Sequence, residues 1–158
     1  MNNKSPVTPK RLLSRRYWVF DLDGTLTQPQ HDFQAIKKAL GIPLDTDILN
    51  HLGTLPTDRA KQKYKLLDQI ELKLAEQARP ATGVEPLLAA LSDEGVQMGI
   101  LTRNSKANAH LVLEVLGLSR YFNYKNVLGR EQAKPKPDPD GVNRLLRQWQ
   151  TTTDQVLM

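Results

Sequence analysis

Two aspartates, Asp21 and Asp23, directly follow the apolar run 17–20 and are separated by a single leucine. Carboxylates this close cannot both ionise easily, so one can act as a nucleophile while the other keeps a proton. A carboxylate that attacks phosphorus forms an acyl phosphate, which divides the hydrolysis of a phosphate ester into two easier steps. A calcium-binding turn is the alternative, but Gly24 comes too early for an EF-hand loop and no glutamate closes it. The pair therefore favours catalysis.

Two further segments carry groups that could bind a phosphate. Thr102 and Arg103 follow the apolar run 99–101, where a hydroxyl could donate a hydrogen bond to a phosphoryl oxygen. A threonine in such a place is more often a helix cap or a turn residue. Lys134 and Lys136 alternate with prolines, which stiffen the segment, so that a fixed ammonium group could neutralise negative charge. Taken alone, the segment is more typical of a solvated basic loop than of a binding site.

The elements expected around these residues alternate between strand and helix. Strands are predicted at 17–20, 96–101, 125–128 and 155–158, and helices at 32–40, 56–79, 84–91, 106–116 and 140–149. Thr82 and Glu85 predict a capping box at the start of helix 84–91. The alternation predicts an α/β fold with a parallel sheet covered on both faces. In such a sheet, chemistry lies at the carboxyl ends of the strands, where Asp21 and Thr102 fall.

Length and composition limit the class of protein. The 158 residues suffice for one domain, or for a core domain with a small insertion, and 39% of them are hydrophobic. No apolar run approaches the roughly 18 residues that a membrane-spanning helix needs. The chain has no cysteine, which excludes disulfides and thiolate zinc sites. We therefore expect a cytoplasmic protein; its oligomeric state cannot be predicted from the sequence.

The net charge of +5 belongs to one end of the chain. Residues 1–16 hold five lysines and arginines and no acidic residue, so the remainder of the chain is neutral. Such an arm could touch nucleic acid or anionic lipid, but neither is the expected partner. Residues 1–16 are predicted to be a basic, disordered leader without a specific partner.

Together, the motifs resemble those of the haloacid dehalogenase superfamily. Its first motif, Asp-x-Asp-x-Thr after an apolar strand, is matched by residues 21–25, and its second, a strand-terminal Ser or Thr, by Thr102. Its third, a lysine often within Lys-Pro-x-Pro, is matched by Lys136; Lys134 fits as well. Lys136 is preferred because Asp140 and Gly141 then fall where the family commonly has an acidic or glycine position before a helix. The resemblance covers residues 17–158 and is closest to the phosphoglycolate-phosphatase-like branch.

The resemblance implies a Rossmann-like parallel core over 17–27 and 80–158 and a small helical cap over 28–79. It implies that Asp21 is the nucleophile and a Mg²⁺ ligand. It also implies that Asp23 is the general acid and then base, and that its backbone carbonyl binds the metal. Thr102 would bind the phosphoryl group of a small phosphorylated metabolite, and Lys136 would orient and neutralise Asp21. Arg103 is also expected to bind the substrate, which would be hydrolysed through an aspartyl phosphate. His31, Phe33, His51 and Arg59 are the candidates within the cap for facing the substrate.

The chain departs from the family after the fourth predicted strand. The family has a pair of acids there, but this strand ends at Met158, so we expect a C-terminally incomplete core that binds metal weakly. A non-catalytic remnant or binding protein is therefore an alternative to a phosphatase. A phosphomutase, which keeps both acids, is another alternative, whereas Asp23 disfavours a dehalogenase.

Overall fold

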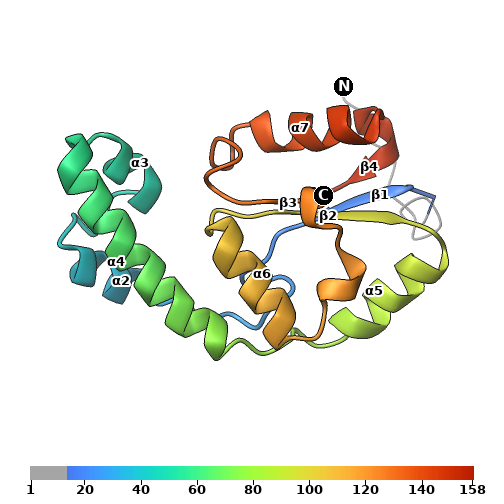
Figure 1. The fold of residues 1–158 in the computed structure, drawn as a ribbon, viewed down its shortest axis with the longest axis horizontal. Coiled ribbons are helices and arrows are strands. Elements are labelled where there is room, and N and C mark those ends of the chain that lie inside the picture. Colours follow the sequence, from blue (N-terminus) through green and yellow to red (C-terminus); the bar gives the residue numbers. More distant parts are fainter. Residues whose placement is uncertain (1–13) are drawn as a thin grey trace, which may run out of the picture.

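The computed structural model describes residues 14–158, and most of the predicted basic leader lies outside them. A four-stranded sheet forms the centre, with β1 (Tyr17–Phe20), β2 (Gln97–Leu101), β3 (Val127–Leu128) and β4 (Val156–Leu157) in the order β3-β2-β1-β4. Every pairing is parallel, and Tyr17 lies opposite both Gln97 and Val156. The sheet confirms the predicted α/β class (Figure 1).

Three helices cover the two faces of the sheet. Helices α5 (Val84–Asp93) and α6 (Lys106–Val115) lie on one face, and α7 (Asp140–Trp149) lies on the other (Figure 1). Successive strand residues point to opposite faces. Phe20 therefore joins the core beneath α5 and α6, while Val19 joins the core beneath α7. Both faces are buried, as the alternation of strand and helix predicts.

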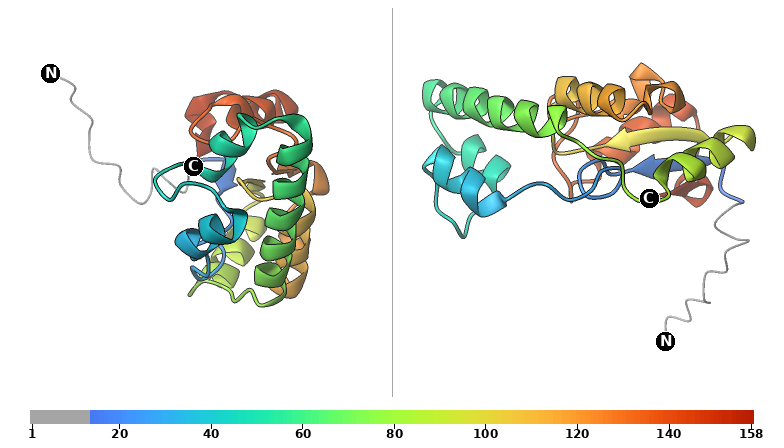
Figure 2. Two further views of the ribbon diagram at one scale, coloured as in Figure 1. Left: turned by 90° about the vertical axis from the view of Figure 1, so that its left-hand side faces the viewer. Right: turned by 90° about the horizontal axis from the view of Figure 1, so that it is seen from below.

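Residues 28–79 form a helical insert between β1 and α5. It contains α2 (Phe33–Leu40), α3 (Ile48–Gly53) and α4 (Thr57–Glu76), which share a separate apolar cluster that includes Ile36, Leu52 and Leu67. The chain enters and leaves the insert through two antiparallel segments, since Gln28 N donates to Arg79 O at 2.9 Å and Thr27 bridges Pro80. The long helix α4 reaches back to pack along α6 (Figure 2).

Several predicted boundaries are wrong in detail. The insert contains α3, which was not predicted, and α4 ends at Glu76 rather than at 79. The predicted capping box is absent, because Gly83 in the left-handed region (φ 78°) starts α5 with no side-chain cap. Strand β3 is shorter than predicted, since Tyr124–Asn126 is a 3₁₀ turn, and another 3₁₀ turn at Thr153–Gln155 delays β4. A third 3₁₀ turn, Ser119–Tyr121, follows α6.

Candidate active site

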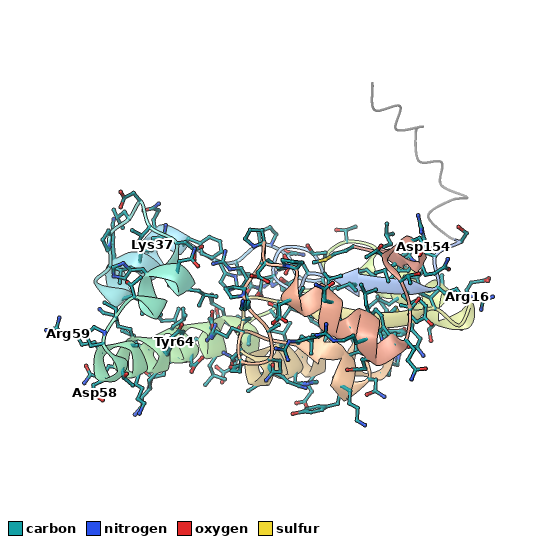
Figure 3. All side chains as sticks on the ribbon, turned by 90° about the horizontal axis from the view of Figure 1, so that it is seen from above. Arg16, Lys37, Asp58, Arg59, Tyr64 and Asp154 are labelled. Atoms are coloured by element: carbon teal, nitrogen blue, oxygen red, sulfur yellow. The ribbon has the colours of Figure 1, made fainter. Side chains whose placement is uncertain are left out.

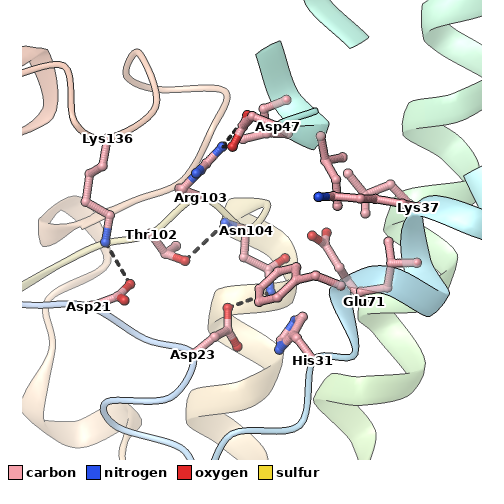
Figure 4. Close-up of a pocket in the computed structure, with 15 residues that line it drawn as sticks. Asp21, Asp23, His31, Lys37, Asp47, Glu71, Thr102, Arg103, Asn104 and Lys136 are labelled. Atoms are coloured by element: carbon pink, nitrogen blue, oxygen red, sulfur yellow. Dashed lines mark hydrogen bonds and ion pairs between the residues drawn. The ribbon is translucent and has the colours of Figure 1, made fainter. Parts of the chain in front are cut away.

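A cavity of about 460 Å³ lies between the carboxyl ends of β1 and β2 and the helical insert (Figure 4). From the sheet side it is lined by Asp21, Asp23, Thr102, Arg103, Asn104 and Lys136. From the insert it is lined by His31, Phe33, Ile36, Lys37, Asp47, Ile48, Leu49, Leu67 and Glu71. The five site residues expected in the core, Asp21, Asp23, Thr102, Arg103 and Lys136, therefore all line one cavity, although they come from three distant parts of the chain.

A tight turn after β1 presents the two aspartates. The carbonyl of Leu22 accepts hydrogen bonds from the amides of Thr25 (3.2 Å) and Leu26 (2.9 Å), which curls the backbone at this point. Gly24 has a φ of +78°, a conformation that glycine adopts without steric cost. The side chain of Leu22 is fully buried and anchors the turn in the core, while both carboxylates line the cavity.

Lys136 forms an ion pair with Asp21. Its Nζ lies 2.8 Å from Asp21 Oδ1, which also accepts a hydrogen bond from the amide of Leu22 at 2.8 Å. Lys134 is exposed, and its backbone amide donates to Asp140 Oδ2 instead, which holds the loop against the start of α7. Of the two lysines that fit the sequence motif, the structure thus places Lys136 against Asp21.

Asp23 differs from Asp21 in its surroundings. Its Oδ2 accepts a hydrogen bond from Asn104 Nδ2 at 3.2 Å. Burial raises the pKa of the Asp23 carboxyl above its usual value, and the charge of Asp21 adds to the rise, while His31 and the Asn104 hydrogen bond oppose it. Two neighbouring carboxyl groups whose environments separate them in this way can take different roles, one as an ionised group and one as an acid.

The loop after β2 is held by its own hydrogen bonds. Thr102 is buried, and its hydroxyl oxygen accepts from the amide of Asn104 at 3.1 Å. Because a hydroxyl both accepts and donates, its proton stays available for an acceptor in the cavity. Arg103 points toward the insert, where its Nη2 lies 2.6 Å and 2.5 Å from the two carboxylate oxygens of Asp47.

A buried ion-pair network joins this loop to the insert. Arg130, which follows β3, donates from Nη2 to Glu71 at 2.7 Å and to Asp68, both on α4. Its Nη1 donates to Glu71 at 3.1 Å and to the carbonyl of Arg103 at 3.2 Å. Burial opposes a charge on Arg130, but the hydrogen bonds and charges of the two acids outweigh it and raise the pKa of the guanidinium. Arg130 therefore connects β3, the loop after β2 and α4.

The insert contributes some of the expected residues and several that were not expected. His31 and Phe33 line the cavity, with stacked rings whose centroids are 5.6 Å apart. His51 does not line it, and Arg59 lies near the end of α4 that is remote from the sheet (Figure 3). Four polar residues that line the cavity were not predicted: Lys37, Asp47, Glu71 and Asn104. Only Asn104 carried a signal, its position in the polar segment directly after a predicted strand.

The oxygen donors near Asp21 have the chemistry that Mg²⁺ requires. Both hydrogen bonds to the Asp21 side chain end on Oδ1, and within residues 14–158 none ends on Oδ2. The same residues contain no group of three or more acidic or histidine side chains that could hold a metal ion. Mg²⁺ keeps several water ligands and is often bound through one or two carboxylates together with a substrate phosphate. Asp21 Oδ2 fits an ion bound in this way.

Known proteins resemble this chain in sequence and in fold. An uncharacterized hydrolase from Saccharomyces cerevisiae is 31% identical over 125 residues, which cover 77% of this chain and 57% of the yeast protein. A phosphoglycolate phosphatase from Mesorhizobium japonicum is 26% identical over 159 residues, which cover 85% of this chain and 69% of that protein. A hydrolase from Pseudomonas syringae has a crystal structure with a TM-score of 0.70 at 23% identity, and the match covers 90% of this chain and 73% of that one.

Residues 14–158 contain no helix that is long and apolar enough to cross a membrane. The chain spans little more than half the length of the yeast relative. The family model described as haloacid dehalogenase-like hydrolase nevertheless matches residues 18–158, which is nearly all of the part that the structure describes. This match agrees with the parallel sheet and with the motifs that meet at the cavity. The chain belongs to the haloacid dehalogenase-like hydrolase family.

Proposed function

We propose that the chain is a phosphatase that hydrolyses a small phosphate ester through an aspartyl-phosphate intermediate. The observation that carries the proposal is that the two neighbouring aspartates, Asp21 and Asp23, lie in different surroundings. Lys136 neutralises Asp21 at 2.8 Å, whereas burial raises the pKa of Asp23. A cavity that presents one carboxylate as a nucleophile beside a second carboxyl group as an acid suits a displacement in two steps.

In the first step, a carboxylate oxygen of Asp21 attacks phosphorus and the bond from phosphorus to the ester oxygen breaks. The leaving alcohol takes the proton of Asp23, which becomes a carboxylate. In the second step, Asp23 removes a proton from a water molecule that attacks the phosphorus, and the bond from phosphorus to the Asp21 oxygen breaks. Inorganic phosphate leaves, Asp21 is again a carboxylate and Asp23 again carries a proton. Thr102 would donate a hydrogen bond to a phosphoryl oxygen, and Lys136 would hold Asp21 and neutralise negative charge.

Asp21 Oδ2 and the Asp23 carbonyl are the groups that would hold Mg²⁺. When bound, the ion would neutralise charge on the phosphoryl oxygens. We further propose that residues 17–27 and 80–158 act as the catalytic core and residues 28–79 as its cap. The insert already forms one wall of the cavity. One relative is a phosphoglycolate phosphatase, which makes a small phosphorylated acid a reasonable first class of substrate.

The test is the hydrolysis of 4-nitrophenyl phosphate by the chain, with Mg²⁺ and with excess chelator. We expect turnover that depends on Mg²⁺. Reduction of the quenched enzyme with borohydride should convert an acyl phosphate at residue 21 to homoserine, which mass spectrometry of the peptide detects. Folded protein that neither turns over nor carries the modification would rule the proposal out for this chain.

The hydrogen bond from Asn104 to Asp23 gives a prediction about pH. This bond favours the ionised carboxylate and so lowers the pKa of Asp23 against the effect of burial. Asn104→Ala should therefore raise that pKa further. Because Asp23 must be protonated to act as an acid, kcat/KM falls as pH rises through its pKa. In the variant, the pH at which kcat/KM falls should therefore be higher. The measurement uses an alkyl phosphate, whose leaving group needs a proton. A fall that stays in place or moves to lower pH would contradict Asp23 as the acid.

A further inference from the structure

The cavity contains three cationic side chains, and they differ in how they are neutralised. Lys136 pairs with Asp21, and Arg103 pairs with Asp47. Lys37, on α2, lines the cavity, and its Nζ donates to the backbone carbonyl of Leu44 at 2.8 Å. Among residues 14–158, no carboxylate forms an ion pair with Lys37. The insert wall therefore carries an ammonium group that forms no ion pair, whereas its two carboxylates, Asp47 and Glu71, are already paired with Arg103 and Arg130.

The pair between Arg103 and Asp47 is easily displaced. About 40% of the Arg103 side chain and 36% of the Asp47 side chain are exposed, so water screens the pair and its net stabilisation is small. Only Nη2 of Arg103 contacts Asp47. In the part of the chain that the structure describes, neither Nη1 nor Nε of Arg103 donates a hydrogen bond. An anion in the cavity could use these donors or take the place of Asp47.

The cavity as a whole is larger than a phosphoryl group needs. The cavity volume of about 460 Å³ is within the range of pockets that enclose a complete small molecule. Four apolar side chains of the insert also line it: Ile36, Ile48, Leu49 and Leu67. Figure 4 shows Lys37 extending from α2 toward the space that Asp21, Asp23 and Arg103 also face. The cavity thus has room, and a cationic side chain from the insert, for more of a substrate than its phosphoryl group.

We infer that Lys37 and Arg103 bind a second anionic group on the leaving part of the substrate. This group would take the place of the Asp47 carboxylate, which neutralises Arg103 in the structure. The chain would therefore prefer phosphate esters that carry a carboxylate or a second phosphate at the other end. This inference rests on the proposed function for the position of the phosphoryl group at Asp21.

The test uses phosphonates, which cannot be hydrolysed. Calorimetry would measure the Kd of methylphosphonate and of a series of phosphonocarboxylates with two, three and four carbons, in the presence of Mg²⁺. The best member of the series should bind about tenfold more tightly than methylphosphonate, as expected for one added charge-assisted contact. In Lys37→Met this preference should largely disappear. Lys38→Met is the matched control, because Lys38 is the next residue on α2, is exposed and does not line the cavity.

Asp47→Asn should have the opposite effect. Asp47 also caps α3 by accepting a hydrogen bond from Asn50 N at 3.0 Å, a role that asparagine can fill. The substitution removes only the charge that competes for Arg103, so the phosphonocarboxylate should bind several-fold more tightly. Equal affinity for the two classes of probe, or no binding of either, would overturn the inference. Loss of 4-nitrophenyl phosphate turnover with the preference intact would contradict the proposed function alone.

Discussion

Asp21→Asn should lower kcat for a phosphate ester by at least about 10⁴-fold, because it removes the atom that attacks phosphorus. Asparagine has nearly the same size and can still accept the hydrogen bonds from Lys136 and Leu22 that end on Oδ1 of Asp21. The fold should therefore survive, and the change in rate should report the chemistry. The measurement is Mg²⁺-dependent release of 4-nitrophenol under saturating substrate.

Asp32→Asn provides the matched control for this variant. Asp32 caps α2 through a hydrogen bond from Ala35 N at 2.9 Å, lies in an exposed position and does not line the cavity. Asparagine is an equally good cap, so this substitution removes one negative charge without removing a structural contact. The control should retain its activity. A residual rate above about a tenth in Asp21→Asn would mean that another group attacks phosphorus, and the two-step mechanism would have to be abandoned.

The sequence was sufficient to predict that Asp21 and Lys136 lie close together, although they are 115 positions apart in the chain. The apolar run before Asp21 predicts a buried strand, and the alternation of strands and helices predicts a parallel sheet. The carboxyl ends of parallel strands converge at one edge, so residues that follow different strands become neighbours. Only the family resemblance favoured Lys136 over Lys134, because the choice depends on the path of a proline-rich loop that is not regular structure.

The contacts between the insert and the core could not be predicted from the sequence. Glu71 and Asp68 lie on a helix rich in charged residues, where acids normally face water. Nothing in the local pattern shows that Glu71 is only 8% exposed in the folded chain. Its burial depends on how α4 packs against the loops after β2 and β3. Helix α3 was not predicted because its six residues are too few to show a helical period.

The ion pair between Arg130 and Glu71 leads to the largest expected effect on stability. The two side chains are 7% and 10% exposed, so both charges have lost most of their contact with water. Arg130→Met would leave Glu71 buried without its countercharge, and removing one partner of such a pair costs about 3–5 kcal/mol. The free energy of unfolding, extrapolated from urea denaturation, should fall by this amount. Arg144→Met is the matched control, because Arg144 pairs with Asp140 at the surface and the loss should stay below about 1 kcal/mol.

A double variant separates the cost of the unpaired charge from the value of the pair. Arg130→Met combined with Glu71→Leu removes both charges, and buried ion pairs replaced by apolar side chains of similar size are often no less stable. We therefore expect the double variant to recover most of the stability that Arg130→Met loses. Activity should not recover in parallel, because the hydrogen bond from Arg130 to the carbonyl of Arg103 is also lost. If the double variant were as unstable as the single one, the stabilisation would come from this backbone contact and from Asp68, and not from the pair with Glu71.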